Sequence, residues 1–86
     1  MADGVSEERQ RAYFERTKQG VLRWLADQGG SAPMREMHDY SESKFLVAHQ
    51  GFSKLMEACV DEGLVEYDSA SGTVSLTDVG RTFTAS

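Results

Sequence analysis

The sequence has a single cysteine, Cys59, and a single proline, Pro33, in 86 residues. One cysteine excludes an intramolecular disulfide and a cysteine-rich metal knuckle. Because Cys59 falls on the apolar stripe of a predicted helix, we expect it to be a buried structural thiol. The two histidines, His38 and His49, are far apart in sequence and have no further ligand at motif spacing. The sequence therefore predicts neither a metal site nor a cofactor.

Long hydrophobic runs are also absent. No stretch approaches the roughly 18 apolar residues that span a bilayer. The N-terminal residues 1–8 have neither the basic region nor the apolar core of a signal peptide. These absences predict a cytoplasmic protein with no membrane partner. We expect residues 1–6 to be a flexible tail and residues 7–86 to form one domain with a modest core.

Positive charge is scarce. Nine Lys and Arg residues face fourteen Asp and Glu residues, which gives a net charge of −5. The two signs balance in residues 1–28, whereas acids exceed bases in residues 29–63 and again in residues 64–86. Phosphate binding relies on local clusters of Lys and Arg, and none is visible beyond Arg23. The composition thus offers little electrostatic attraction for nucleic acid.

Catalytic motifs are missing as well. No Ser–His–Asp set, paired carboxylates or glycine-rich phosphate loop accompanies His49 at a sensible spacing. Asp61 and Glu62 end a predicted helix and are interpreted as surface charge. We therefore do not expect an enzyme.

Hydrophobic periodicity predicts a first helix over about residues 7–28. Gly29-Gly30 ends it, because glycine adopts the left-handed conformation that follows a last helical turn. Gly20, within this helix, indicates a close packing contact. A second, short helix is predicted after Ser31-Ala32-Pro33, with serine as its cap and proline in its first turn, and it ends near Tyr40.

A third helix is predicted to start at the polar stretch Ser41-Glu42-Ser43-Lys44, which offers two capping serines, and to end near Glu62. Gly51 interrupts it and marks either a kink or the true start of a shorter helix. Gly63 is its C-terminal stop. Its apolar stripe has spacings of three and four and consists of Phe45, Ala48, Phe52, Leu55, Met56 and Cys59.

Two short strands follow the third helix. Residues 64–67 and 73–76 are rich in strand-forming residues, and the intervening Asp68-Ser69-Ala70-Ser71-Gly72 is typical of a turn. The pattern predicts a two-stranded hairpin. Thr77 and Asp78 then cap a final short helix that runs through Phe83.

The segment from residue 52 to residue 81 resembles the winged helix-turn-helix superfamily, particularly MarR-type and PadR-type regulators. The matching positions are Ser53, Met56, Cys59, Gly63, Leu64, Val65, Leu76, Thr77 and Gly80. The whole resemblance covers about residues 7–84. It implies a mainly α fold with a small β-hairpin, in which a three-helix core carries a two-stranded wing and a short C-terminal helix.

The resemblance also implies a DNA-binding transcriptional regulator whose third helix enters the major groove. The residues that would contact double-stranded DNA are His49, Gln50, Ser53 and Lys54, with Lys44 and Arg35 in support. Glutamine is suited to adenine, lysine to guanine or phosphate, and serine to phosphate. The same residues are equally consistent with the solvated face of an ordinary amphipathic helix.

Two features depart from that expectation. The predicted wing, residues 64–76, contains no Lys or Arg, and Asp68 lies near its tip. The third helix carries Glu57, Asp61 and Glu62 against Lys54. The alternative is a winged-helix module whose acidic recognition surface binds a protein. An acidic surface is also typical of a protein from a high-salt cytoplasm.

One small family with which the chain shares short segments is the D protein that accompanies dissimilatory sulfite reductase. The similar segments are Lys18-Gln19 with Val21, residues 64–67, and Ser71-Gly72-Thr73. This second resemblance accords with the protein-binding alternative.

The first helix also carries more aromatic residues than one small core needs. Tyr13, Phe14 and Trp24 lie along it. A surplus apolar face is common at dimer seams, so the sequence indicates a possible homodimer through this helix.

Overall fold

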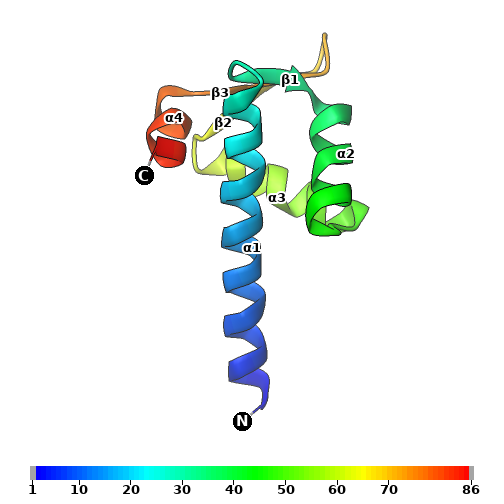
Figure 1. Ribbon diagram of the computed structural model, residues 1–86, viewed down its shortest axis with the longest axis vertical. Helices are drawn as coiled ribbons and strands as arrows, with labels where there is room; N and C mark the ends of the chain where they lie inside the picture. Colours follow the sequence, from blue (N-terminus) through cyan, green and yellow to red (C-terminus); the bar gives the residue numbers. More distant parts are fainter. Residues whose placement is uncertain (1, 86) are drawn as a thin grey trace.

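A helical body carrying a small antiparallel sheet is seen in the computed structural model, which describes residues 2–85 and the side chains of residues 7–85. The elements are α1 (Ala2–Asp27), β1 (Ser31–Pro33), α2 (Met34–Phe45), α3 (His49–Asp61), β2 (Val65–Asp68), β3 (Thr73–Leu76) and α4 (Asp78–Ala85). The chain is mainly helical, as predicted. Helices α2, α3 and α4 surround the C-terminal half of α1, and the sheet lies at that end (Figure 1).

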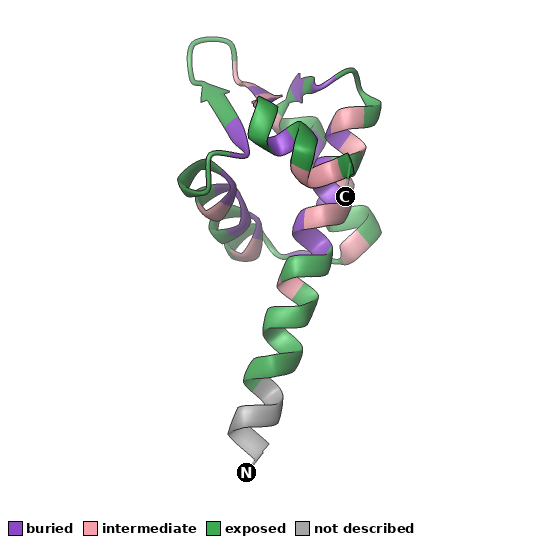
Figure 2. Ribbon diagram, turned by 90° about the vertical axis from the view of Figure 1, so that its left-hand side faces the viewer, coloured by how far each residue is buried: buried purple, intermediate pink, exposed green. Residues whose placement is uncertain are grey.

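From residue 7 onward, α1 projects from the body of the protein, which it reaches at Tyr13 and Phe14 (Figures 1 and 2). Residues 7–13 on this projection are exposed to solvent. The predicted tail, residues 1–6, lies outside the part whose side chains are described, although the helical backbone begins at Ala2. At the other end the predicted stop is confirmed, because Gly29 and Gly30 have φ angles of 89° and 94°.

The boundary between the second and third helices differs from the prediction. Helix α2 continues to Phe45 instead of ending near Tyr40, and α3 begins at His49. The polar stretch from Ser41 to Lys44 therefore belongs to α2 and does not cap the third helix. The hydroxyl of Ser41 is buried and donates a hydrogen bond of 2.8 Å to the carbonyl of His38. Serine can bond to a preceding carbonyl inside a helix or cap the start of a helix, and the sequence alone does not distinguish the two positions.

The sheet has three strands rather than the predicted two. Its order is β1-β3-β2, and both pairings are antiparallel. Ser31 lies in β1, where its hydroxyl is 2.8 Å from that of Ser75, so it does not cap α2. The residue preceding α2 is Pro33, which makes no side-chain cap. Strand β1 covers an edge of β3 that would otherwise present unpaired backbone groups.

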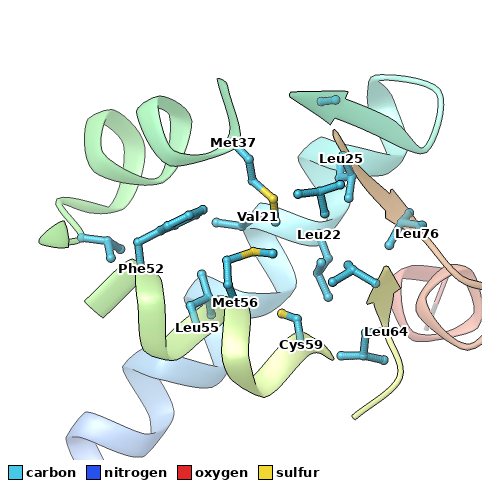
Figure 3. Close-up of a cluster of buried hydrophobic side chains, with 14 residues drawn as sticks. Val21, Leu22, Leu25, Met37, Phe52, Leu55, Met56, Cys59, Leu64 and Leu76 are labelled. Carbon is cyan, nitrogen blue, oxygen red and sulfur yellow. The ribbon is translucent and has the colours of Figure 1, made fainter. Parts of the chain in front are cut away.

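The core is formed where α3 and the sheet pack on the C-terminal half of α1 (Figure 3). Leu55 and Cys59 of α3 face Val21 and Leu22 of α1 in this view. The predicted close contact at Gly20 is confirmed, since a methyl group there would clash with the ring of Phe45. The buried apolar residues are Val21, Leu22, Leu25, Ala32, Met37, Val47, Phe52, Leu55, Met56, Cys59, Leu64, Val65, Val74 and Leu76.

A buried lysine ties α1 to the end of α3. Lys18 is only 2% exposed, and its ammonium group lies 3.0 Å from a carboxylate oxygen of Glu62 and 3.1 Å from one of Glu15. Burial by itself lowers the pKa of Lys18, but hydrogen bonds and charges from the two glutamates outweigh it and hold that pKa above its ordinary value. Glu62, which the sequence indicated as surface charge, is thus a structural partner.

Residues 76–80, which run from the end of β3 into the first turn of α4, connect α4 to the end of α3 through hydrogen bonds. The hydroxyl of Thr77 donates to the carbonyl of Gly63 and accepts a 3.0 Å hydrogen bond from the amide of Gly80. The Thr77 amide also donates to the carbonyl of Leu64 at 3.0 Å. The predicted capping role of Thr77 is confirmed. Gly80 is buried so closely against the Leu64 carbonyl that a Cβ atom would overlap it.

Replacing Gly80 by alanine should lower the free energy of unfolding by about 1–3 kcal/mol, because the added methyl group must displace backbone. This is the net change, because the steric cost of the methyl group outweighs the gain of about 1 kcal/mol that alanine usually brings within a helix. Urea denaturation followed by circular dichroism measures the difference. The matched control is the exposed neighbour Val79, whose replacement by alanine should change stability by less than about 0.5 kcal/mol. Equal stability of both variants would mean that α4 does not pack closely on Leu64.

Candidate nucleic-acid interface on helix α3

The residues predicted to contact DNA are all exposed to solvent. They are Arg35 and Lys44 on α2, and His49, Gln50, Ser53 and Lys54 on α3. The structure brings Arg35, His49 and Ser53 together around a hollow of about 400 Å³ between the two helices. Lys44, Gln50 and Lys54 do not line this hollow. The predicted set therefore divides into residues around the hollow and residues outside it.

The hollow has an apolar floor and a histidine pair at its side. Its floor consists of Met34, Phe52 and Met56. His38 and His49 also line it, and their ring centroids are 5.4 Å apart in an edge-on arrangement. The Nε2 atom of His38 is buried and has no hydrogen-bond partner among the described residues. Sequence reasoning missed His38 as a neighbour of His49, since only the contact between α2 and α3 brings them together.

The start of α3 carries no negative side chain. Residues 43–56 contain no Asp or Glu, and the first turn of α3 is free of acids. The residue preceding the helix is Ala48, which makes no side-chain cap. The amide groups of a first helical turn carry partial positive charge and are satisfied by caps, water or ligands. An uncapped helix start without acidic side chains is therefore favourable for an anion such as phosphate.

The second half of α3 has the opposite character. Glu57 and Asp61 lie one turn apart on its exposed side. They border a second hollow of about 260 Å³, which is lined by Met34, Met56, Glu57, Val60, Asp61 and Tyr67. One helix thus presents an acid-free half and an acidic half.

Asp68 has a structural role in the hairpin. Its carboxylate accepts hydrogen bonds of 3.0 Å from the Ala70 amide and from the Ser71 hydroxyl. Its carbonyl also accepts one of 2.7 Å from the Gly72 amide. This network organises the turn between β2 and β3. The sequence indicated Asp68 both as the start of a turn and as a charge that repels phosphate, and the structure confirms the turn, which the Asp68 carboxylate stabilises.

The aromatic face of α1 is largely used within the chain. Trp24 stacks on Tyr40 with a centroid distance of 5.1 Å, and Phe14 packs beside the core. Tyr13 is 48% exposed, and its hydroxyl donates to the carbonyl of Phe45. Of the three residues that indicated a dimer seam, only Tyr13 keeps a large exposed surface.

The link between α2 and α3 contains a strained residue. Leu46 has a φ of 58° and is 85% exposed. A residue with a Cβ atom loses about 1–2 kcal/mol in the left-handed conformation. The amides of Leu46 and Val47 donate to the carbonyls of Glu42 and Ser41, which closes the end of α2 in this conformation. The turn that sets the angle between the two helices is therefore built without the glycine that it favours.

Cys59 is buried within the core, as predicted. Burial raises the pKa of its thiol to about 12, and the nearby charge of Lys18 lowers it only in part. Within residues 7–85 no three His, Cys, Asp or Glu side chains gather in a way that could hold a metal ion. None of the helices in the described part of the chain is both long and apolar enough to cross a membrane.

Replacing Leu46 by glycine should raise the free energy of unfolding by about 0.5–1 kcal/mol, because relief of the left-handed strain exceeds the backbone entropy cost of glycine. Urea denaturation tests the change. Leu46→Ala is the control, since alanine removes the same exposed side chain but keeps the Cβ atom. An equal gain in both variants would attribute the effect to the exposed side chain instead of the backbone.

The Cys59 thiol should react slowly with dithionitrobenzoate at pH 8 in the native protein, because the thiolate is the reactive species and burial suppresses it. In denaturant the same thiol should react rapidly, with an ordinary pKa of about 8.5. Absorbance of the released thiolate measures both rates. Rapid labelling of the native protein would contradict the buried position of Cys59.

Comparison with known proteins found no match among protein-family models, curated proteins or solved structures.

Proposed function

We propose that this protein is a small winged-helix DNA-binding protein that regulates transcription, with the first half of α3 as its recognition element. The order of a helix, a short strand, two helices, a hairpin and a final short helix supports the winged-helix assignment. The observation that carries the DNA assignment is the uncapped, acid-free start of α3. It combines a favourable position for phosphate with exposed side chains suited to base edges.

The roles follow from the positions of the side chains. Gln50 and Lys54 are four residues apart and share one exposed side of α3, so both can reach the same groove. Gln50 suits adenine, and Lys54 suits guanine or phosphate. Arg35, across the hollow on α2, and Lys44, in the last turn of that helix, would contact the phosphate backbone. Phosphate contacts of this kind orient the protein without reading sequence.

Self-association through the exposed part of α1 would join two such units. Dimeric regulators of this type double their phosphate contacts and read two half-sites. Tyr13, which is 48% exposed, is the aromatic residue of α1 that would contribute to this contact.

A labelled mixed-sequence duplex should bind the full chain at low salt, and fluorescence anisotropy should show the affinity falling steeply between about 50 and 200 mM salt. Lys54→Glu should weaken binding at least about tenfold, because it removes a phosphate contact and adds repulsion. Glu57→Lys, three residues along α3, should strengthen it. The steepness of the salt dependence reports the number of phosphates neutralised.

Arg23→Glu is the matched control, because it makes the same charge change at an exposed position of α1, away from α3. It should alter the affinity much less than Lys54→Glu does. Equal losses in both variants would mean that only net charge matters. Absence of binding at low salt, where electrostatic attraction is strongest, would exclude the DNA-binding function.

A second function is favoured by the acidic half of α3. Glu57 and Asp61 lie beside apolar side chains, and residues 64–76 add no Lys or Arg to offset them. Such a surface suits a basic protein better than a nucleic acid. The second candidate is therefore a winged-helix module that binds a protein, with the acidic half of α3 as part of the contact.

A further inference from the structure

The second hollow is lined mainly by apolar side chains. Val60 and Tyr67, on α3 and β2, are 47% and 45% exposed, and they lie beside Met34 and Met56. The two methionines also line the first hollow, so the two hollows are neighbours along α3. We call the second hollow the α3–β2 trough, which is lined by Met34, Met56, Glu57, Val60, Asp61 and Tyr67. Methionine adapts its shape to a partner better than branched side chains do.

The carboxylates of the trough lack positive neighbours. Glu57 and Asp61 are four residues apart on α3, a spacing at which like charges repel by a few tenths of a kcal/mol. Among the described residues no Lys, Arg or His lies within ion-pair distance of either carboxylate. By contrast, the neighbouring Glu62 is neutralised by Lys18. The trough therefore combines exposed apolar area with uncompensated negative charge.

This combination selects the class of ligand. A nucleic acid is repelled by the two carboxylates and has no large apolar groups to fill the hollow. An amphipathic helix presents apolar side chains at spacings of three and four, and basic residues beside them reach the acidic rim. We propose that the α3–β2 trough binds a cationic amphipathic helix of a partner protein. The proposal deepens the second function above and rests on it.

A second copy of this chain is a poorer occupant. Its projecting segment, residues 7–16, has three Arg against three Glu, so it carries no net charge to match the trough. The same segment offers few apolar side chains, because Tyr13 and Phe14 already contact the body of their own chain. Charge complementarity thus favours a basic partner over self-association at this surface.

The probe is a synthetic peptide of about 18 residues, long enough to be helical, with leucine on one face and lysine on the other. It is titrated into the isotope-labelled full chain and followed by amide NMR. We expect saturable shifts centred on Val60, Asp61 and Tyr67. Asp61→Lys, which replaces a carboxylate by a positive charge, and Val60→Ser, which removes apolar surface without adding charge, should each weaken binding at least about tenfold. Glu42→Lys, an equal charge change at an exposed position of α2, should leave the affinity within about twofold.

Each other outcome overturns the proposal in a distinct way. A peptide with glutamate in place of lysine that binds equally well would show that charge does not select the ligand. Shifts centred on residues 69–72 of the turn between β2 and β3, with Val60 and Asp61 unshifted, would keep an acidic protein-binding surface but exclude the trough. A wild-type dimer in sedimentation that Val60→Ser dissociates would make a second copy the occupant. Absence of saturable binding by the lysine peptide would exclude the trough outright.

The DNA titration run on the same variants separates the two functions. Asp61→Lys should not weaken duplex binding, because it removes a negative charge from the side of α3. Lys54→Glu should not weaken peptide binding, because Lys54 does not line the trough. A variant that loses both ligands would show that one surface serves both, which contradicts a separate protein site.

Discussion

The packing of one face of α3 against the C-terminal half of α1 is the contact on which the rest of the structure depends. Leu55 and Cys59 meet Val21 and Leu22 in the centre of the core (Figure 3). Burial of each large apolar side chain contributes about 1.5–3 kcal/mol. Because this face of α3 is buried, the residues on the opposite face of the helix are the ones left exposed to solvent.

The end of α3 is held by polar contacts in addition to the core. Lys18 neutralises Glu62 at the last turn, and Thr77 ties the following Gly63 to the start of α4. These contacts fix both ends of the β2–β3 hairpin relative to α3. The surface that α3 shares with β2 is therefore held in place, and a pre-formed surface loses less entropy on binding a partner. The acid-free start and the acidic end of α3 are both exposed on the surface that these contacts hold in place.

The outward face of α3 was predictable because helical periodicity is local. The residues proposed for DNA contact are exposed, as the spacing of Phe52, Leu55, Met56 and Cys59 indicates. The turn between β2 and β3 was predictable for the same reason, since Asp68 bonds to groups within four residues. The start of α3, by contrast, could not be predicted from local sequence. A serine such as Ser41 can be satisfied inside a helix as well as at a cap, and Ala48, which precedes the real start at His49, makes no side-chain cap.

The sequence by itself determined the helix stop at Gly29-Gly30, the strand pair β2–β3, the capping of α4 by Thr77 and the face of α3 that is buried. Each depends on residues that are close together in the chain. Only the tertiary structure decided that Ser31-Ala32-Pro33 forms a strand, that Lys18 is buried, and that two hollows adjoin α3. A three-residue strand needs β3 to supply its hydrogen bonds, and a buried lysine needs a carboxylate from another helix. These partners lie more than 40 residues away in the sequence, so a local sequence pattern cannot predict the contacts.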